Sequence, residues 1–242
     1  TLDANDLTVT NNDNYGTGGG IYALNSTIDI DRLVLSHNSA ENSGGAYLYG
    51  VAGTWNTVEM VGNEAAIYGA LRGDLVGKDN EDFILTDVFV SANEGQSPGV
   101  YLEAIVGTTA RLVDAEVCKN IGDLTDGEGA VVLRDNSAAE VLRVYDNTTE
   151  AGIDIFVQKS FSSVSLSNVS VVGNSNHGVV ADPSEDETLI ITNTLIAYNA
   201  GTGLFDEEDT EDSIVLSNSV LWNNGINLEN WGTNPIGSQG NE

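Results

Sequence analysis

One short phrase recurs along the chain and constrains the fold more than any other feature. The segments LSNVSVVGN (166–174), ITNTLIAYN (191–199) and LSNSVLWNN (216–224) share an asparagine at the third and at the last position. The last asparagine, called here the marker asparagine, recurs at intervals of 25 to 30 residues. The nine markers are Asn12, Asn38, Asn63, Asn93, Asn120, Asn147, Asn174, Asn199 and Asn224. Periods of this length are typical of solenoids.

Apolar residues alternate before each marker, as expected for a strand with one buried face. Positions five and three before the marker hold pairs such as Val88 and Val90. Position six before the marker is often polar, which predicts a kink, and the residues there include Asp6, Asp87, Asp114, Asn168, Asn193 and Asn218. A second apolar pair precedes the kink, and a third short strand follows a glycine after the marker, as at 45–48. A period of this length has no room for three strands and a crossover helix.

We therefore predict an all-β fold: a single-stranded parallel β-helix of about nine coils, with three short strands per coil. Asparagine carries a donor and an acceptor and tolerates a left-handed φ, so stacked markers can bond one another and the turn. The glycine before the third strand is expected to permit a positive φ. A β-sandwich fits the short strands but does not hold nine near-equal periods, and a β-propeller needs blades of about 40 residues.

The repeats predict one domain over residues 1–242, because no linker interrupts them. Residues 225–242 are predicted to form a C-terminal cap or tail. The longest interval, 64–93, is expected to place its extra residues in a loop at 72–80. The first strand pair begins at Leu2, with no residues to cover its edge. Three explanations are open: the chain is truncated there, a partner covers the edge, or copies stack head to tail into an oligomer or filament.

The glycine and asparagine motifs also carry a resemblance. The segments GGGI (18–21) and GGAY (44–47), with hydrophobic-x-x-Asn at 9–12, 35–38, 60–63 and 90–93, resemble the GGA-I and F-x-x-N repeats of polymorphic outer membrane proteins. More broadly, nearly the whole chain is similar to secreted bacterial β-helix repeat proteins of the pectate-lyase-like superfamily. The resemblance implies a right-handed helix and a secreted or cell-surface location. Val, Leu or Met replaces the phenylalanine of the second motif, so membership of the adhesin family does not follow.

Charge excludes two classes of partner. The chain has 37 acidic and 8 basic residues, a formal net charge of -29. Nucleic acids and anionic membranes need a basic surface, so we predict neither partner. No apolar run approaches the roughly 18 residues of a membrane span, so no membrane insertion is expected. Few lysines and many acids suit a salty or calcium-containing extracellular medium.

The basic residues do not predict a catalytic site. A polysaccharide lyase needs Arg or Lys beside carboxylates on one sheet, whereas Arg111, Arg134 and Arg143 have different offsets from their markers. Of the four segments typical of a polygalacturonase, only 176–178 shows a likeness, and its His177 is expected to be a corner residue. We predict no catalytic residues and a structural, adhesin-like or filament-forming protein. The alternative is a carbohydrate-active β-helix, either a lyase, a hydrolase or a carbohydrate-binding module.

Two acidic loops form a candidate calcium site. The loops 182–187 and 206–212 begin eight and seven residues after their markers, so they are expected to stack. Crowded carboxylates need a counterion, and Ca²⁺ prefers oxygen ligands. The candidate ligands are Asp182, Glu185, Asp186, Glu187, Asp206, Glu207, Glu208, Asp209 and Asp212. Loops screened by ordinary salt are an equally valid interpretation.

Three tyrosines form a candidate binding surface. Tyr22, Tyr47 and Tyr101 occupy the outward position of the third strand, and the coil between the last two offers Tyr68 or Leu71. An aromatic column on a flat sheet can bind sugar rings, such as those of a polysaccharide, or a cell-surface partner. Aromatic side chains at such positions also pack on one another, which is the alternative interpretation.

Overall fold

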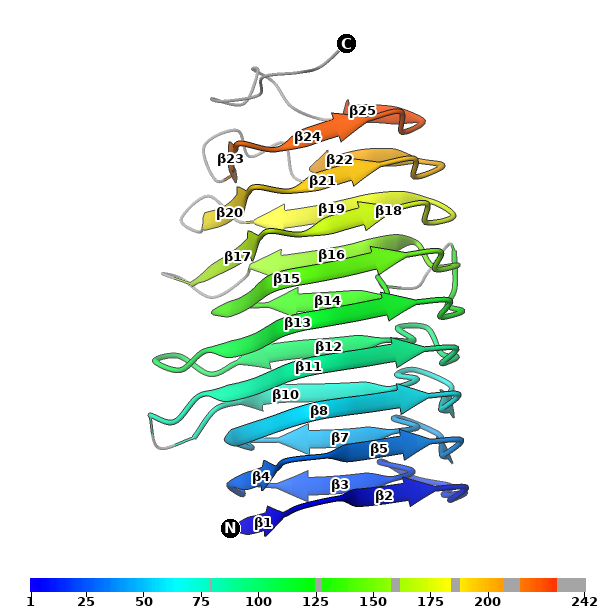
Figure 1. The fold of residues 1–242 in the computed structure, drawn as a ribbon, viewed down its shortest axis with the longest axis vertical. Coiled ribbons are helices and arrows are strands. Elements are labelled where there is room, and N and C mark those ends of the chain that lie inside the picture. The colour runs from blue at the N-terminus through cyan, green and yellow to red at the C-terminus, as the bar shows by residue number, and fades with distance from the viewer. Residues whose placement is uncertain (79, 125–127, 158–161, 184–187, 207–213, 230–242) are drawn as a thin grey trace.

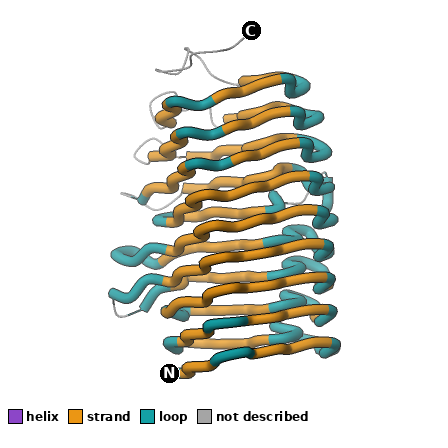
Figure 2. Tube along the Cα trace, viewed as in Figure 1, coloured by secondary structure: helices purple, strands orange, loops and turns teal. Residues whose placement is uncertain are grey.

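In a computed structural model, the chain forms a parallel β-solenoid of about eight turns. The structure describes residues 1–78, 80–124, 128–157, 162–183, 188–206 and 214–229, and these residues contain strands and loops but no helix. Figure 1 shows two large sheets as layers along the long axis, and Figure 2 shows the loops gathered at the corners between them. The predicted all-β parallel fold is confirmed, with about eight turns where nine coils were expected.

The first large sheet, sheet A, contains the strands that precede the marker asparagines. Its 14 strands form nine rows stacked along the axis, numbered here from the N-terminus. The strands are β1 (Leu2–Ala4), β2 (Leu7–Thr10), β4 (Ile28–Ile30), β5 (Leu33–Ser36), β8 (Gly53–Val61), β11 (Phe83–Ser91), β13 (Ala110–Cys118), β15 (Ser137–Tyr145), β17 (Ser163–Ser167), β18 (Ser170–Val172), β20 (Thr188–Thr192), β21 (Leu195–Ala197), β23 (Ile214–Ser217) and β24 (Val220–Trp222).

The second large sheet, sheet C, contains one strand from each row. Its nine strands are β3 (Ile21–Leu24), β7 (Ala46–Tyr49), β10 (Leu71–Val76), β12 (Val100–Ala104), β14 (Val131–Arg134), β16 (Ala151–Val157), β19 (His177–Pro183), β22 (Thr202–Asp206) and β25 (Ile226–Glu229). A short pair, β6 (Ser39–Ala40) and β9 (Glu64–Ala65), lies at the corner between the sheets. Every pairing between these strands is parallel, so each row bonds to the rows before and after it along the chain.

The core lies between the two sheets and is continuous along the axis. Alternate residues of each strand point inward, and side chains such as Leu35, Met60 and Leu102 have no solvent exposure. The largest buried aromatic pair is Trp55 and Phe83, whose ring centres are 5.6 Å apart in an edge-to-face arrangement. This alternation of buried and outward residues is the pattern that the sequence predicted.

The polar kinks bend sheet A without breaking its pairing. Asp87 and Asp114 have left-handed φ angles of 55° and 50°, as the other predicted kink residues also do. In rows 3 to 6 the two predicted short strands join through the kink into one strand of nine residues. Two kinks carry β-branched residues, Thr57 and Val141, with φ of 51° and 57°.

The marker asparagines form a buried ladder along the corner after sheet A. The Asn93 side-chain amide donates to Asn120 Oδ1 (3.0 Å) and to the Met60 carbonyl (3.0 Å). Its Oδ1 accepts from the backbone N–H (2.9 Å) and the side-chain amide (3.0 Å) of Asn63. Side-chain bonds of this kind link every consecutive pair from Asn12 to Asn224. The predicted stacking of the markers is confirmed.

Two details of the corner differ from the prediction. The left-handed φ belongs to the residue before the marker, such as His37 (53°) or Ala92 (55°), because the chain turns before the asparagine enters the core. The glycine before the third strand is required for space and not for a positive φ. A Cβ on Gly45 would lie 2.2 Å from the Ala70 carbonyl oxygen of the next row, so the rows pack too closely for a side chain.

Candidate functional site

The three predicted tyrosines share one outward column of sheet C. Tyr22 pairs with Tyr47 in the strand register, and Arg72 pairs with both Tyr47 and Tyr101. Arg72 therefore occupies the position for which the sequence offered Tyr68 or Leu71. Leu71 points into the core instead.

Two arginine side chains lie against the aromatic rings of this surface. The rings of Tyr22 and Tyr47 are stacked at 5.7 Å and 13°. Arg72 Cζ lies 5.6 Å from the Tyr47 ring centre and 5.5 Å from that of Tyr101. Arg134 and Phe156 lie in the column two positions further along the strands, and Arg134 Cζ is 5.3 Å from the Tyr101 ring centre and 4.5 Å from that of Phe156. We call these six residues, Tyr22, Tyr47, Arg72, Tyr101, Arg134 and Phe156, the outer stack. Each guanidinium lies within the range of a cation–π interaction.

The outer stack buries most of its aromatic surface in its own contacts. Tyr22 is 53% exposed, whereas Tyr101 is only 3% exposed. Tyr68 enters from the corner and covers Tyr101, with ring centres 5.1 Å apart, and Arg72 lies 4.4 Å above the Tyr68 ring. The three tyrosines thus share a column but do not present three open rings. Tyr22 alone among them is largely exposed to solvent.

Carboxylates neutralise both arginines of the outer stack. Asp74 Oδ2 lies 2.7 Å from Arg72 Nε and accepts a hydrogen bond of 3.1 Å from the Tyr47 hydroxyl. Glu128 lies 3.2 Å from Arg134 and accepts a 2.6 Å bond from the Ser97 hydroxyl. Because Asp74 is almost fully buried, its charge depends on Arg72 for compensation.

Burial keeps the tyrosines of this surface protonated. Burial, together with the nearby Glu128 carboxylate, raises the pKa of Tyr68 to about 12. The pKa of Tyr47 is also about 12, because of burial and the Asp74 charge, and burial raises the pKa of Tyr101 as well. At neutral pH these hydroxyls are donors and acceptors of hydrogen bonds and do not act as bases.

His37 lies at a corner, whereas His177, which the sequence predicted to be a corner residue, is the first residue of β19 and pairs with Ala151. The His177 ring stacks on Phe205 at 5.4 Å and 17°, and its Nδ1 accepts a 3.0 Å bond from the Thr202 N–H. Burial lowers the pKa of His177, so the neutral form that accepts this bond is favoured. His37 has a left-handed φ immediately before its marker asparagine. Both histidines therefore have a structural role, His37 in its turn and His177 between two rows of sheet C.

The acidic loops lie mostly outside the described residues. Glu185, Asp186, Glu187, Glu207, Glu208, Asp209 and Asp212 fall in the undescribed ranges. Asp206 pairs with Ala181, so it is one position out of register with Asp182, and it is buried at the end of β22. Within the described part of the chain, no group of three or more His, Cys, Asp or Glu residues could hold a metal ion. Calcium binding by these loops stays a prediction.

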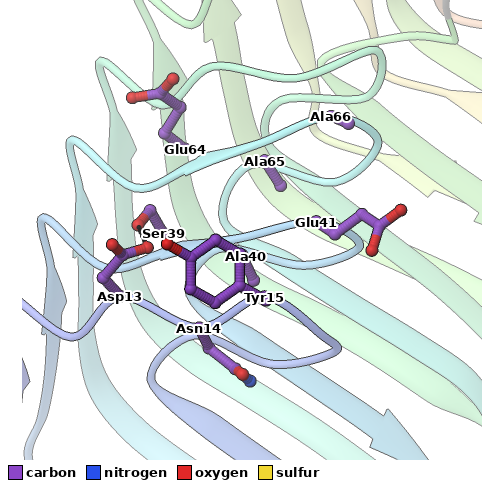
Figure 3. A pocket seen from close by; sticks show the side chains of 9 residues that line it. All are labelled: Asp13, Asn14, Tyr15, Ser39, Ala40, Glu41, Glu64, Ala65 and Ala66. Carbon is purple, nitrogen blue, oxygen red and sulfur yellow. Dashed lines mark hydrogen bonds between the residues drawn. The ribbon is translucent and has the colours of Figure 1, made fainter.

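A shallow groove follows the asparagine ladder at the corner between the sheets. It consists of two adjoining hollows of about 530 and 520 Å³ that share Ala65 and Ala66. Figure 3 shows the first hollow, whose lining includes Tyr15, Asp13, Glu41 and Glu64; the Glu41 and Glu64 carboxylates point away from the Tyr15 ring. Tyr15 is 91% exposed. The groove therefore combines an open aromatic ring with carboxylate oxygens, which can accept hydrogen bonds from hydroxyl groups.

The sequence contains a signal for the groove and for Arg72 that counting from the marker asparagines does not show. Small residues stand two positions after successive markers, namely Ala40, Ala65, Gly95 and Gly122, and they form the floor of the groove. Counting from the residue before the third strand, instead of from the marker, aligns Tyr22, Tyr47, Arg72 and Tyr101. Ala70 replaces the usual glycine in row 3 and obscured this alignment.

All five arginines of the chain pair with carboxylates. Besides the two in the outer stack, the pairs are Arg32 with Asp6 and Asp31, Arg111 with Glu140 (2.6 Å), and Arg143 with Glu116 (3.3 Å). The last two pairs lie on the outer face of sheet A and are partly exposed. No arginine is therefore left as a free positive charge for a substrate.

Comparisons with known proteins add no identity to this geometry: no family model, curated protein or solved structure matches the chain. The described segments also contain no apolar helix of membrane-spanning length.

Proposed function

We propose that the chain is a non-catalytic β-solenoid of a secreted or cell-surface protein, with a structural, adhesin-like or filament-forming role. The observation that carries this proposal is the pairing of all five arginines with carboxylates. A lyase or hydrolase acting on acidic polysaccharides needs an unpaired cation beside its substrate. An arginine already held by a carboxylate and by aromatic faces is a poor base and a poor neutraliser of substrate charge.

The location rests on charge and on the resemblance noted in the sequence. A net charge of -29 with only eight basic residues suits a surface that faces external salt. The glycine and asparagine repeats resemble those of secreted bacterial β-helix proteins in the pectate-lyase-like superfamily. We propose that the chain is related to these proteins. A long rigid body with one continuous core is well suited to hold a binding surface away from a cell.

Incubation with a panel of acidic and neutral polysaccharides tests the absence of catalysis. We expect no new reducing ends and no unsaturated products, with and without calcium. Release of products would contradict the proposal if Arg72→Met or Arg134→Met abolished it while Arg143→Met did not. The Arg143 variant is the control because this arginine lies on the opposite sheet.

A carbohydrate-binding role is the second candidate, and the exposure of Tyr15 in a hollow that is also lined by three acidic residues favours it. Aromatic faces and carboxylate oxygens together recognise the ring and the hydroxyls of a sugar. Titration calorimetry with neutral oligosaccharides would test this role. Binding should be lost in Tyr15→Ala and retained in Tyr22→Ala, which removes an exposed tyrosine from the other surface. Equal loss in both variants would contradict a site in the groove.

A further inference from the structure

The outer face of sheet A changes character along the axis. Each of rows 1 to 6 carries at least one charged residue in this sheet, namely Asp3, Asp29, Glu59, Asp87, Arg111, Asp114, Glu116, Glu140 and Arg143. The six strands of rows 7 to 9, β17, β18, β20, β21, β23 and β24, contain no charged residue. In a chain with 19% charged residues, this is a marked local change.

The kink column changes in the same way. The kinks of rows 1, 4 and 5 are aspartates, whereas those of rows 7, 8 and 9 are Asn168, Asn193 and Asn218. Asp and Asn both tolerate the left-handed φ that this position requires. The backbone therefore does not demand asparagine here. The exchange removes three negative charges that the fold would have accepted.

Large apolar side chains replace the charges in rows 8 and 9. Ile190 pairs with Val215, and Leu195 pairs with Val220, so their side chains are neighbours across the rows. Trp222 extends the group at the corner side. These five side chains are between 38% and 48% exposed. We call them, with the serine, threonine and asparagine side chains around them in rows 7 to 9, the uncharged face. Its strands, β17 to β24 of sheet A, are labelled in Figure 1.

We propose that the uncharged face is the interface between two copies of this chain, packed side by side with sheet A against sheet A. Exposed apolar groups on a soluble surface mark contact sites. Two copies with a charge of -29 each repel one another over most of their surfaces, and the uncharged face lets them approach at lower electrostatic cost. Flat β-sheets bury apolar faces by packing about 10 Å apart, and a two-fold axis would bring the same residues together.

The contact would be weak and strengthened by salt. Three rows of about ten residues cover roughly 15 by 30 Å, which is smaller than the about 800 Å² per partner of a typical stable complex. Salt screens the repulsion between the remaining acidic surfaces and leaves apolar contacts intact. Association should therefore increase with ionic strength, in contrast to an association driven by opposite charges. This lateral contact lies on the face of sheet A and does not involve head-to-tail stacking.

Sedimentation velocity of the whole chain from about 1 to about 200 µM tests the proposal, in roughly 0.05 M and 0.5 M sodium chloride. We expect the mass to rise from 25.4 kDa toward twice that value with concentration, and at lower concentration in high salt. Leu195→Glu and Val215→Glu should remain monomeric. Phe89→Glu is the matched control, because Phe89 is a 39% exposed apolar residue on the same face in row 4, and it should behave like the wild type.

Several results would overturn the proposal. A wild-type chain that is monomeric at all concentrations and salts would do so, as would association that persists in Leu195→Glu or falls equally in Phe89→Glu. Circular dichroism melting identifies a variant that has lost its fold. In that case Val220→Gln, which removes apolar surface without adding charge, takes its place and should weaken the dimer. Loss of the dimer on removal of residues 230–242 would assign the contact to that segment instead.

Discussion

Two columns of side chains run along this solenoid, the asparagine ladder inside and the outer stack outside, and they follow different rules. Every row contributes a marker to the ladder, and the markers from Asn38 to Asn199 are at most 1% exposed. The outer stack spans only rows 1 to 6, contains charges, and ranges from buried Tyr101 to exposed Tyr22. Both columns connect neighbouring rows, but only the ladder satisfies backbone groups that the core would otherwise leave unpaired.

This difference separates what the fold requires from what it permits. A buried corner has backbone donors and acceptors in every row, so the same amide must recur in every row. The outer face has access to water, so its residues can change from tyrosine to arginine to valine without leaving a polar group unpaired. Specialised functions are therefore to be sought among the outward positions, where the repeat is relaxed.

Removal of one ladder amide should have the largest effect on stability. Asn93→Ala deprives the Asn63 N–H and the Met60 carbonyl of their side-chain partners inside the core. Each orphaned buried group costs about 1–3 kcal/mol, so we expect the free energy of unfolding to fall by at least about 3 kcal/mol. Urea denaturation followed by circular dichroism measures it. The outward Asn56→Ala should change stability by less than about 0.5 kcal/mol, and equal effects would remove the distinction between inner and outer positions.

Breaking the outer stack at Arg72 should cost less than breaking the ladder. Arg72→Met leaves the buried Asp74 carboxylate without its cation, and we expect a loss of about 2 kcal/mol in the free energy of unfolding. Arg72→Met combined with Asp74→Asn should recover part of that loss, because no uncompensated charge remains. Arg32→Met is the exposed counterpart and should have little measurable effect. A double variant less stable than Arg72→Met would contradict this explanation, because it would show that the uncompensated Asp74 charge is not the main cause of the lost stability.

Alkaline pH should weaken the packing of Tyr68 on the outer stack and leave the uncharged ladder unaffected. Tyr68 has a pKa of about 12 in the folded chain and about 10 when unfolded, so the folded state retains its proton longer. Its stabilisation is complete below about pH 10 and is lost as the pH rises to about 12, a change of about 2 kcal/mol. Denaturation midpoints across this range should fall less steeply for Tyr68→Phe than for the wild type. Equal slopes would contradict the burial of this hydroxyl.

The kinks of sheet A require a left-handed φ but face outward, so they constrain the backbone and leave the side chain variable. One substitution in this column is expected to stabilise the fold. Val141 has a left-handed φ of 57°, which a β-branched side chain adopts at a cost of order 1–2 kcal/mol. Val141→Asn should therefore raise the free energy of unfolding by about 1 kcal/mol, because asparagine tolerates this backbone. Asp114→Asn should change the free energy of unfolding little, because aspartate already tolerates this backbone conformation. Thermal unfolding of the two variants would compare them, and a destabilised Val141→Asn would show that the valine side chain makes a compensating contact.

The interior of the fold was predictable from the sequence because its requirements repeat. The markers, the alternating apolar residues and the aspartate or asparagine kinks recur with one spacing, so each row supports the interpretation of the others. The conformational role of the corner residues was less accessible. The left-handed φ falls on residues as different as His37, Lys119 and Tyr198, which share no sequence signature.

The outer surface was only partly predictable because it depends on contacts between rows with different corner lengths. The tyrosine column was correctly placed, but Tyr68 and Arg134 reach Tyr101 from other rows and bury it. Such contacts arise from register, which counting from the markers does not give once the corners vary in length. The groove along the ladder was not predicted because small residues line it. A single small residue in one repeat gives no signal, and the pattern emerges only when several repeats are compared.

The close approach of the rows at Gly45 and its equivalents has a consequence for how this molecule can vary in length. Since each row bonds only to its two neighbours, the length of the solenoid changes in steps of about 4.8 Å, one step for each row added or removed. Excising one whole unit, for example from Glu94 through Asn120, would join Asn93 to Ile121, a residue that already follows a ladder asparagine. The shortened solenoid would be one row shorter, and the spacing between the remaining rows would not change.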